Sequence, residues 1–184
     1  VPGFLVGDII VPADPGEPED RRHLLFASPE QLHYLSLCRT WYVDSTFLIQ
    51  PDPFYQLWSI HGFMVNGEDS KQVPLLCVMM SGRRAVDYNA VFHRVLEILP
   101  SPPLLQEFVL DFEKPLWNSL RETFPSANIR GCVFHWTQAI YKKIQSSNLS
   151  TLYKTHEQTR SLLKKLMSLP FLPVGHIELV FKAL

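Results

Sequence analysis

The chain has 184 residues, of which 46% are hydrophobic, and a formal net charge of −1 at pH 7. These values are typical of a globular protein and disfavour a disordered chain or a protein that binds nucleic acid through bulk positive charge. The chain has no run of 18 or more apolar residues, no basic segment before its first apolar stretch, and three cysteines without framework spacing. We therefore expect an intracellular protein with no membrane span or secretion signal.

The first 40 residues predict a lead-in made of a loop and a short helix. Residues 12–20 combine three prolines with acidic residues and a glycine, which is typical of a loop. Ser28 then precedes Pro29, the arrangement of an N-cap followed by the first helical residue.

Three apolar segments, 41–49, 54–65 and 72–80, are rich in aromatic and β-branched residues and predict strands. Asn66-Gly67 between the last two is a strong hairpin signal. The three strands are therefore expected to form an antiparallel meander.

The periodicity then changes to helix alternating with strand. Apolar residues at helical spacing predict helices, and short apolar runs between them predict strands. In chain order we expect a helix over 84–99, a strand over 104–111, a helix over 112–124 capped by Asp111, a strand over 129–135, and helices over 136–145 and about 149–169. This order predicts an α/β fold with a mixed five-stranded sheet and a C-terminal helical extension.

An aspartate occurs in the first predicted strand, Asp44, and another ends the fourth, Asp111. A helical crossover returns the fourth strand in parallel to a strand already in the sheet. The pattern leaves open whether it joins beside the first strand or beside the third. Beside the first, the two aspartates become neighbours, and a divalent cation would offset their repulsion of roughly 3–4 kcal/mol.

Each aspartate also has a simpler interpretation. Asp111 precedes a predicted helix and fits an N-cap, while Asp44 fits a solvent-facing strand position or a pairing with Arg39. Capping does not exclude metal binding, so both hypotheses stay open for Asp111.

Three segments together carry a family resemblance: "DSTFLIQPDPFYQLWSIHGF", "VPLLCVMM" and "LDFEKPLWNSLRETFPSANIRGCVFHWTQAIYKKIQ". They resemble the catalytic domain of Mutator-like element (MULE) transposases, in order and with suitable gaps, from about residue 26 to 180. The resemblance implies a ribonuclease-H-like fold, an Asp-Asp-Glu (DDE) triad, and Mg²⁺ or Mn²⁺ in a two-metal site. By position, Asp44 and Asp111 are the first two acids and metal ligands, although Ser45 stands where the family usually has glycine.

The resemblance leaves the third acid unplaced. The late carboxylates are Glu157 and Glu178, and neither fits the family's glutamate, so we expect it outside this chain. The segment "CVFHW" matches a Cys-x-x-His element of the family and makes His135 a candidate accessory residue. Cys132 and His135 are disfavoured as a zinc pair because no second ligand pair occurs.

We therefore expect three segments: a lead-in over 1–40, a ribonuclease-H-like catalytic core over 41–145, and a helical extension over 146–184 that begins an insertion. The resemblance implies a transposase that cuts and joins DNA in the nucleus, with transposon ends and target as partners and a possible homo-oligomeric state. An incomplete or domesticated copy is expected. The alternative is a catalytically inactive module, derived from a transposase, that binds DNA or protein.

Overall fold

The computed structural model describes residues 3–17, 19–47 and 50–184. The chain divides into two compact units, Val1–Arg130 and Gly131–Leu184, which are described separately. Within the described ranges, no helix combines the length and the apolar character needed to cross a membrane.

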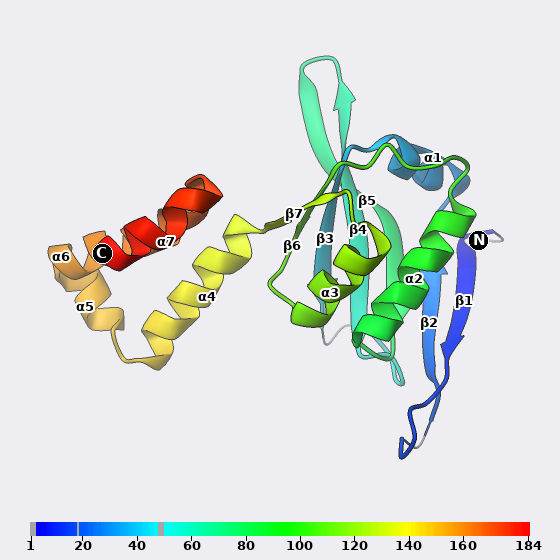
Figure 1. The fold of residues 1–184 in the computed structure, drawn as a ribbon, viewed down its shortest axis with the longest axis horizontal. Coiled ribbons are helices and arrows are strands. Elements are labelled where there is room, and N and C mark those ends of the chain that lie inside the picture. The colour runs from blue at the N-terminus through cyan, green and yellow to red at the C-terminus, as the bar shows by residue number, and fades with distance from the viewer. Residues whose placement is uncertain (1–2, 18, 48–49) are drawn as a thin grey trace. The chain divides into compact units, whose positions relative to one another are not determined.

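The first unit is built on a mixed sheet with strand order β1-β2-β5-β4-β3-β6-β7 (Figure 1). The strands are β1 (Leu5–Val11), β2 (Arg21–Phe26), β3 (Thr40–Thr46), β4 (Gln56–Asn66), β5 (Asp69–Met80), β6 (Glu107–Leu110) and β7 (Asn128–Gly131). The sheet is mixed because β6 runs parallel to β3, whereas the β1–β2, β2–β5, β5–β4 and β4–β3 pairs are antiparallel.

The predicted antiparallel meander is confirmed as β3–β4–β5. Gly67 lies in the β4–β5 turn with φ of 63°, a conformation that glycine adopts without steric cost. The predicted short helix is α1 (Pro29–Leu37), and Ser28 caps it through a reciprocal pair of hydrogen bonds with Gln31. Residues 48–49 of the predicted first strand lie outside the described residues.

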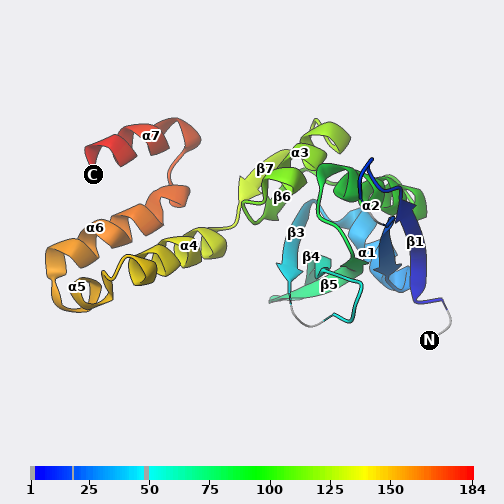
Figure 2. The same ribbon diagram turned by 90° about the horizontal axis from the view of Figure 1, so that it is seen from below.

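Two helices, α2 (Ala85–Ile98) and α3 (Lys114–Thr123), pack side by side over one face of the sheet (Figures 1 and 2). The core between them and the sheet contains tilted and edge-to-face aromatic rings, for example Phe92 with Trp58 at 5.4 Å and Phe108 with Phe124 at 5.1 Å between centroids. Such pairs add about 0.5–1.5 kcal/mol each beyond area burial. This aromatic core packs α2 and α3 against the central strands of the sheet.

The first 40 residues differ from the predicted lead-in, because they contribute two strands as well as the loop and α1. The strands β1 and β2 extend the sheet from β5, so the described sheet has seven strands rather than the predicted five. The difference arises because β2 is a strand through its pairing with β5, which is distant in the sequence. The two strands are antiparallel, with Leu25 opposite Val78. Residues 1–2 and 18 of the predicted lead-in are outside the described ranges.

Two further predictions are corrected near the C-terminal part of the core. The predicted strand over 129–135 is shorter, because it ends at Gly131 and helix α4 (Val133–Ser146) begins where strand was expected to continue. Asp111 is not the N-cap of α3; that position belongs to Glu113, since the chain stays extended for two residues after Asp111.

The second unit is helical. It contains α4, α5 (Ser150–Thr155), α6 (Glu157–Ser168), a short 3₁₀ helix (Leu169–Phe171) and α7 (Val174–Ala183). Trp136 Nε1 of α4 donates a hydrogen bond to the carbonyl of Leu166 in α6 at 3.0 Å, and Ile144 and Leu169 are buried. The expected helical extension is therefore present, although the compact unit begins at Gly131. That the segment over 146–184 begins an insertion stays a prediction.

Candidate functional site

The strand β6 joins the sheet beside β3, the first strand of the meander, which settles the alternative that the sequence left open. The parallel register pairs Thr40 with Glu107 and Tyr42 with Val109. Continued by two residues, this register brings Asp44 opposite Asp111. Neighbouring strands lie about 4.8 Å apart, so the register predicts that the two carboxylates are neighbours at this end of the sheet. We call this pair the aspartate edge.

The alternation of side chains puts both aspartates on the same face of the sheet. Val43 and Leu110, one residue earlier in each strand, are buried in the core beneath α2 and α3. Because successive side chains point to opposite faces, Asp44 and Asp111 point away from that core. Asp44 is exposed and Asp111 is partly exposed, so a solvated ion reaches both.

Backbone groups of the following residue orient each carboxylate. The Ser45 amide donates to Asp44 Oδ1 at 2.9 Å, and the Phe112 amide donates to Asp111 Oδ1 at 2.6 Å. Trp117 of α3 also donates its indole N–H to the Asp111 carbonyl at 2.7 Å. These bonds fix the end of β6 and the direction of each carboxylate.

A hydroxyl and an imidazole lie next to Asp44 on strand β4. Ser59 is the cross-strand partner of Asp44, and its hydroxyl lies 2.9 Å from Nε2 of His61. Burial lowers the pKa of His61, and the negative charge of Asp44 offsets only part of this effect. Burial therefore favours the neutral form of the imidazole. His61 carried no signal in the sequence, because its proximity to Asp44 depends on the pairing of β3 with β4.

A third carboxylate, Glu113, approaches Asp111 from the start of α3. Burial raises the pKa of Glu113; a hydrogen bond from Tyr88 and the charge of Arg83 lower it, and the charge of Asp111 adds to the rise. Glu113 lies two residues after Asp111 in the sequence. The sequence analysis identified only Asp111 as a candidate there, because Asp111 directly follows the predicted strand. Its bond to Tyr88 ties it to α2.

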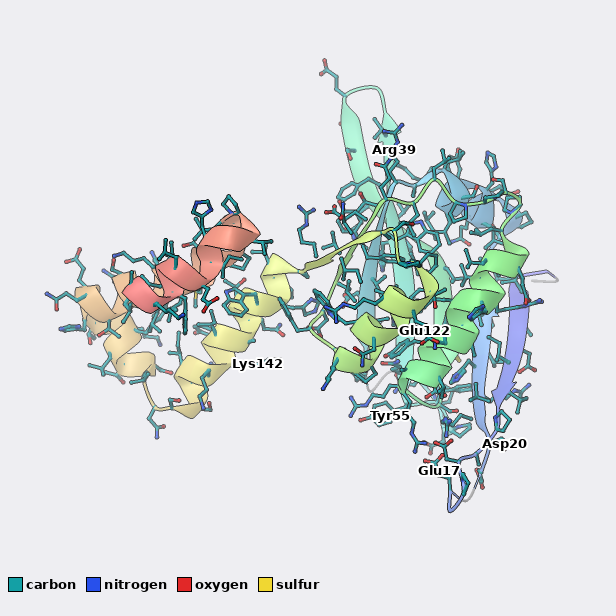
Figure 3. The ribbon with its side chains drawn as sticks, in the orientation of Figure 1. Glu17, Asp20, Arg39, Tyr55, Glu122 and Lys142 are labelled. Atoms are coloured by element: carbon teal, nitrogen blue, oxygen red, sulfur yellow. The ribbon has the colours of Figure 1, made fainter. Side chains whose placement is uncertain are left out.

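The other candidate residues lie elsewhere. Arg39, the proposed partner of Asp44, precedes β3 and lies at the opposite end of the sheet from Tyr55 (Figure 3). Five residues of strand separate Arg39 from Asp44, a span of roughly 16 Å. Pairing with Arg39 therefore does not explain Asp44.

The late carboxylates are on surface helices of the second unit. Glu157 begins α6, and Glu178 of α7 pairs with Lys182 at 2.5 Å. Cys132 is the N-cap of α4 and His135 lies in its first turn, so these two also belong to the second unit. The accessory role of His135 stays a prediction. Within residues 3–17, 19–47 and 50–184, no group of three or more His, Cys, Asp or Glu residues is arranged to hold a metal ion.

The aspartate edge nonetheless fits a divalent cation by the chemistry of its donors. Mg²⁺ and Mn²⁺ take oxygen ligands, and Mg²⁺ keeps several waters while it binds through one or two carboxylates. Two carboxylates on one solvent-facing edge match this requirement, and a shared cation would offset their repulsion.

A second group of charged residues lies near the same end of the sheet and is buried between β2 and α2. It consists of Arg21, His23 and Asp87, and we call it the buried cluster. Arg21 Nε donates to Asp87 Oδ1 at 2.8 Å, and His23 Nε2 lies 3.3 Å from the same oxygen. Burial alone would raise the pKa of Asp87, but these bonds and one from the Arg84 amide hold it below its usual range. The cluster joins β2 to the first turn of α2.

A glycine makes this junction sterically possible. A Cβ on Gly82 would lie 2.5 Å from Arg21 Cδ and 2.6 Å from Asp87 Oδ2. The turn between β5 and α2 therefore passes over the buried cluster at a distance that no other residue allows without displacement.

A family model described as the MULE transposase domain matches residues 40–139, which contain both aspartates of the aspartate edge. No curated protein matches the chain in sequence.

Proposed function

Because the chain belongs to the MULE transposase domain family, we propose that it is a DDE-type enzyme that cuts and joins DNA strands with a divalent cation held by Asp44 and Asp111. The single observation that supports this proposal most strongly is the parallel β3–β6 register, which brings the two aspartates to one edge. The matched residues 40–139 include that pair of strands.

The proposed cation is Mg²⁺ or Mn²⁺. Such ions supply an activated water or 3′ hydroxyl and stabilise the leaving oxygen in phosphodiester chemistry. The role of the chain is to hold and orient: Asp44 and Asp111 provide oxygen ligands, and the Ser45 and Phe112 amides fix the carboxylate directions. A third acid is expected from outside the residues that form the aspartate edge.

The mixed sheet supports a ribonuclease-H-like fold as part of this proposal. An antiparallel meander followed by a parallel strand beside its first member is the arrangement that brings two strand-end acids together. A DNA substrate also implies work in the nucleus, and transposon ends and target DNA would be the partners.

A strand-cleavage assay tests the proposal. The full protein is incubated with labelled DNA carrying candidate transposon ends, with Mn²⁺ or with EDTA. We expect Asp44→Asn and Asp111→Asn each to reduce metal-dependent cleavage by at least about 100-fold, because even partners of metal ligands contribute 10–100-fold. The matched control is Asp69→Asn, an exposed aspartate in the β4–β5 hairpin, which should retain full cleavage.

Calorimetric titration with Mn²⁺ decides between the enzyme and the binding-module hypothesis. Metal binding that is lost in both aspartate variants and kept in Asp69→Asn supports the enzyme. If neither metal binding nor cleavage responds to Asp44 and Asp111, the enzyme proposal is wrong. A folded chain that binds DNA without either activity would identify the inactive module.

A further inference from the structure

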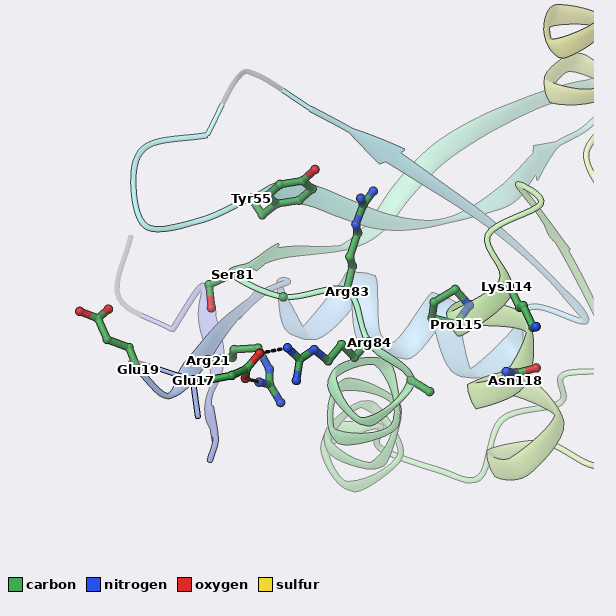
Figure 4. Close-up of a pocket in the computed structure, with 12 residues that line it drawn as sticks. Glu17, Glu19, Arg21, Tyr55, Ser81, Arg83, Arg84, Lys114, Pro115 and Asn118 are labelled. Atoms are coloured by element: carbon green, nitrogen blue, oxygen red, sulfur yellow. Dashed lines mark hydrogen bonds and ion pairs between the residues drawn. The ribbon is translucent and has the colours of Figure 1, made fainter. Parts of the chain in front are cut away.

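A cleft of about 720 Å³ opens at one end of the first unit (Figure 4). Its walls include Tyr55 before β4, the turn Ser81–Ala85 between β5 and α2, and the start of α3 at Lys114 and Asn118. The loop before β2 contributes Glu17 and Glu19. A volume of this size falls in the range of ligand sites.

The directions of the strands place this cleft at the same end of the sheet as the aspartate edge. β3 and β6 are parallel, and β5 runs the same way because both strands are antiparallel to the intervening β4. The carboxyl ends of β3, β5 and β6 therefore lie at one end of the sheet. Lys114 follows Asp111 by three residues, and the turn at Arg83 leaves the end of β5.

Two of the four cations in the cleft are engaged by acidic residues. Arg84 forms ion pairs with Asp14 and Glu17, and Arg21 forms ion pairs with Glu17 and Asp87. The other two, Arg83 and Lys114, are exposed and have no ion pair within 4.0 Å among the described residues. The cleft therefore presents two available positive charges.

The acidic residues lie toward one end of this cleft. Figure 4 shows Glu17 and Glu19 on the side of Arg84, and Lys114 with Asn118 on the far side of Arg83. Glu17 is engaged by two arginines, so Glu19 and the Glu113 carboxyl group near Arg83 are the acids that oppose an anion here. The region of the cleft between Arg83 and Lys114 is suited to a phosphate, because both side chains are positively charged.

An aromatic ring lies beside the same cations. The Arg83 guanidinium carbon lies 4.8 Å from the centroid of the Tyr55 ring, which is 49% exposed. Phe47, also exposed, meets Tyr55 edge to face at 6.0 Å. Cations that take phosphates next to an exposed ring on which a base stacks are the features of single-stranded nucleic-acid sites.

We propose that this cleft binds an unpaired segment of the DNA strand next to the aspartate edge, with Arg83 and Lys114 on the phosphates and Tyr55 stacked on a base. This assignment rests on the proposed function for its choice of DNA. It adds a substrate class, unpaired rather than duplex DNA, and three residues that bind it. Unpaired nucleotides beside a cleavage site leave the scissile phosphate accessible to the carboxylate-held ion.

Fluorescence anisotropy in EDTA tests this assignment without catalysis. The full chain is titrated with a labelled oligothymidine of about 20 nucleotides, enough to fill one site, and with a blunt duplex of equal length. We expect Arg83→Gln and Lys114→Gln each to weaken oligothymidine binding by about five- to tenfold at low salt. The double variant should reduce the slope of log K against log salt by about 1.4.

Matched variants separate local contact from total charge. Arg39→Gln and Lys71→Gln remove the same charges from exposed positions outside the cleft, and they should leave binding within about twofold. Tyr55→Leu should weaken oligothymidine binding by about tenfold through lost stacking, whereas Tyr55→Phe keeps the ring and should keep the affinity. Both Tyr55 variants should change duplex binding less than oligothymidine binding.

The outcomes separate this inference from the proposed function. If Arg83→Gln and Lys114→Gln lower binding no more than Arg39→Gln and Lys71→Gln do, the cleft assignment is wrong even when cleavage depends on Asp44 and Asp111. Equal losses on duplex and oligothymidine for Tyr55→Leu would also overturn it. Selective loss of oligothymidine binding in a chain that shows no cleavage would sustain the cleft and reject the enzyme.

Discussion

The buried cluster and the aspartate edge both place aspartates near the same end of the first unit, but in opposite surroundings. In the buried cluster, Asp87 receives hydrogen bonds from Arg21 and the Arg84 amide and contacts His23, all away from water. At the aspartate edge, Asp44 and Asp111 each accept a bond from the amide of the next residue and are at least partly exposed to solvent. The first arrangement satisfies its charge inside the protein, whereas the second exposes its carboxylates to solvent.

The difference shows how burial decides the use of a carboxylate. A buried ion costs several kcal/mol unless its partners satisfy it, so Asp87 is tied to the stability of the fold. An exposed carboxylate contributes little to stability and costs little to keep. We therefore expect the aspartate edge to contribute less to the stability of the fold than Asp87 does.

Replacing Asp87 should have the largest effect on stability. Asp87→Asn keeps the size of the side chain but leaves the buried Arg21 guanidinium with Glu17 as its only acidic partner among the described residues. We expect a loss of about 3 kcal/mol in the free energy of unfolding, measured by urea titration. The control Asp14→Asn breaks an exposed pair with Arg84 and should cost under about 1 kcal/mol. Equal losses in both variants would end the contrast between buried and exposed carboxylates.

The pH dependence of unfolding adds a second check on Asp87. Its folded-state pKa is held below the ordinary value of 3.8, so its contribution is present above that value. The contribution is lost as the pH falls through the lowered folded-state pKa, because the unfolded chain then binds the proton more readily. Urea midpoints should therefore fall more steeply below pH 3.8 in the unmodified chain than in Asp87→Asn. Parallel curves would contradict this sign.

Gly82→Ala should have an intermediate effect on stability. The added Cβ would meet Arg21 Cδ and Asp87 Oδ2 at 2.5 and 2.6 Å, so the turn or the buried cluster must shift. Such overpacking costs about 1–3 kcal/mol, measured by thermal unfolding. Gly175→Ala is the matched control, since a Cβ there meets nothing within 4 Å. Unchanged stability in both variants would show that the turn between β5 and α2 can shift without cost, and would contradict this prediction.

Neutralising the aspartate edge should have the smallest effect on stability, and in the opposite direction. Asp44→Asn removes a charge that repels Asp111 at an exposed site, so we expect a gain below about 1 kcal/mol in EDTA. Mn²⁺ should raise the stability of the unmodified chain by mass action and leave the variant unchanged. A large destabilisation by Asp44→Asn would mean that this residue supports the fold and would remove the contrast with Asp87.

Local patterns in the sequence predicted the central part of the fold. Ser28 and Pro29 identified the start of α1, and Asn66-Gly67 identified the β4–β5 hairpin, because capping and turn formation depend on adjacent residues. The strands β1 and β2 were missed since β2 is held by β5, far along the chain. The N-cap of α3 was placed two residues early, because an aspartate in extended chain and one at a helix start look alike in sequence.

The candidate site shows the same limit. The sequence identified Asp44 and Asp111 as acids at the ends of strands. Whether they are neighbours depends on whether β6 pairs with β3 or with β5, and only the strand order of the sheet shows that it pairs with β3. The cleft residues Tyr55, Arg83 and Lys114 gave no signal, since three unrelated segments supply them. Their grouping follows from the shared direction of β3, β5 and β6, which no local periodicity encodes.

The β1–β2 hairpin has a practical consequence for anyone who trims this protein to its recognisable family domain. The matched region begins at residue 40, yet Arg21 and the strand that shields the outer edge of β5 come before it. A fragment starting at residue 40 would leave Asp87 without the Arg21 guanidinium. It would also make β5 an exposed edge strand, which is prone to pair with other chains and aggregate. Expression trials should therefore retain at least the segment from Leu5 onward, and shorter versions are expected in inclusion bodies.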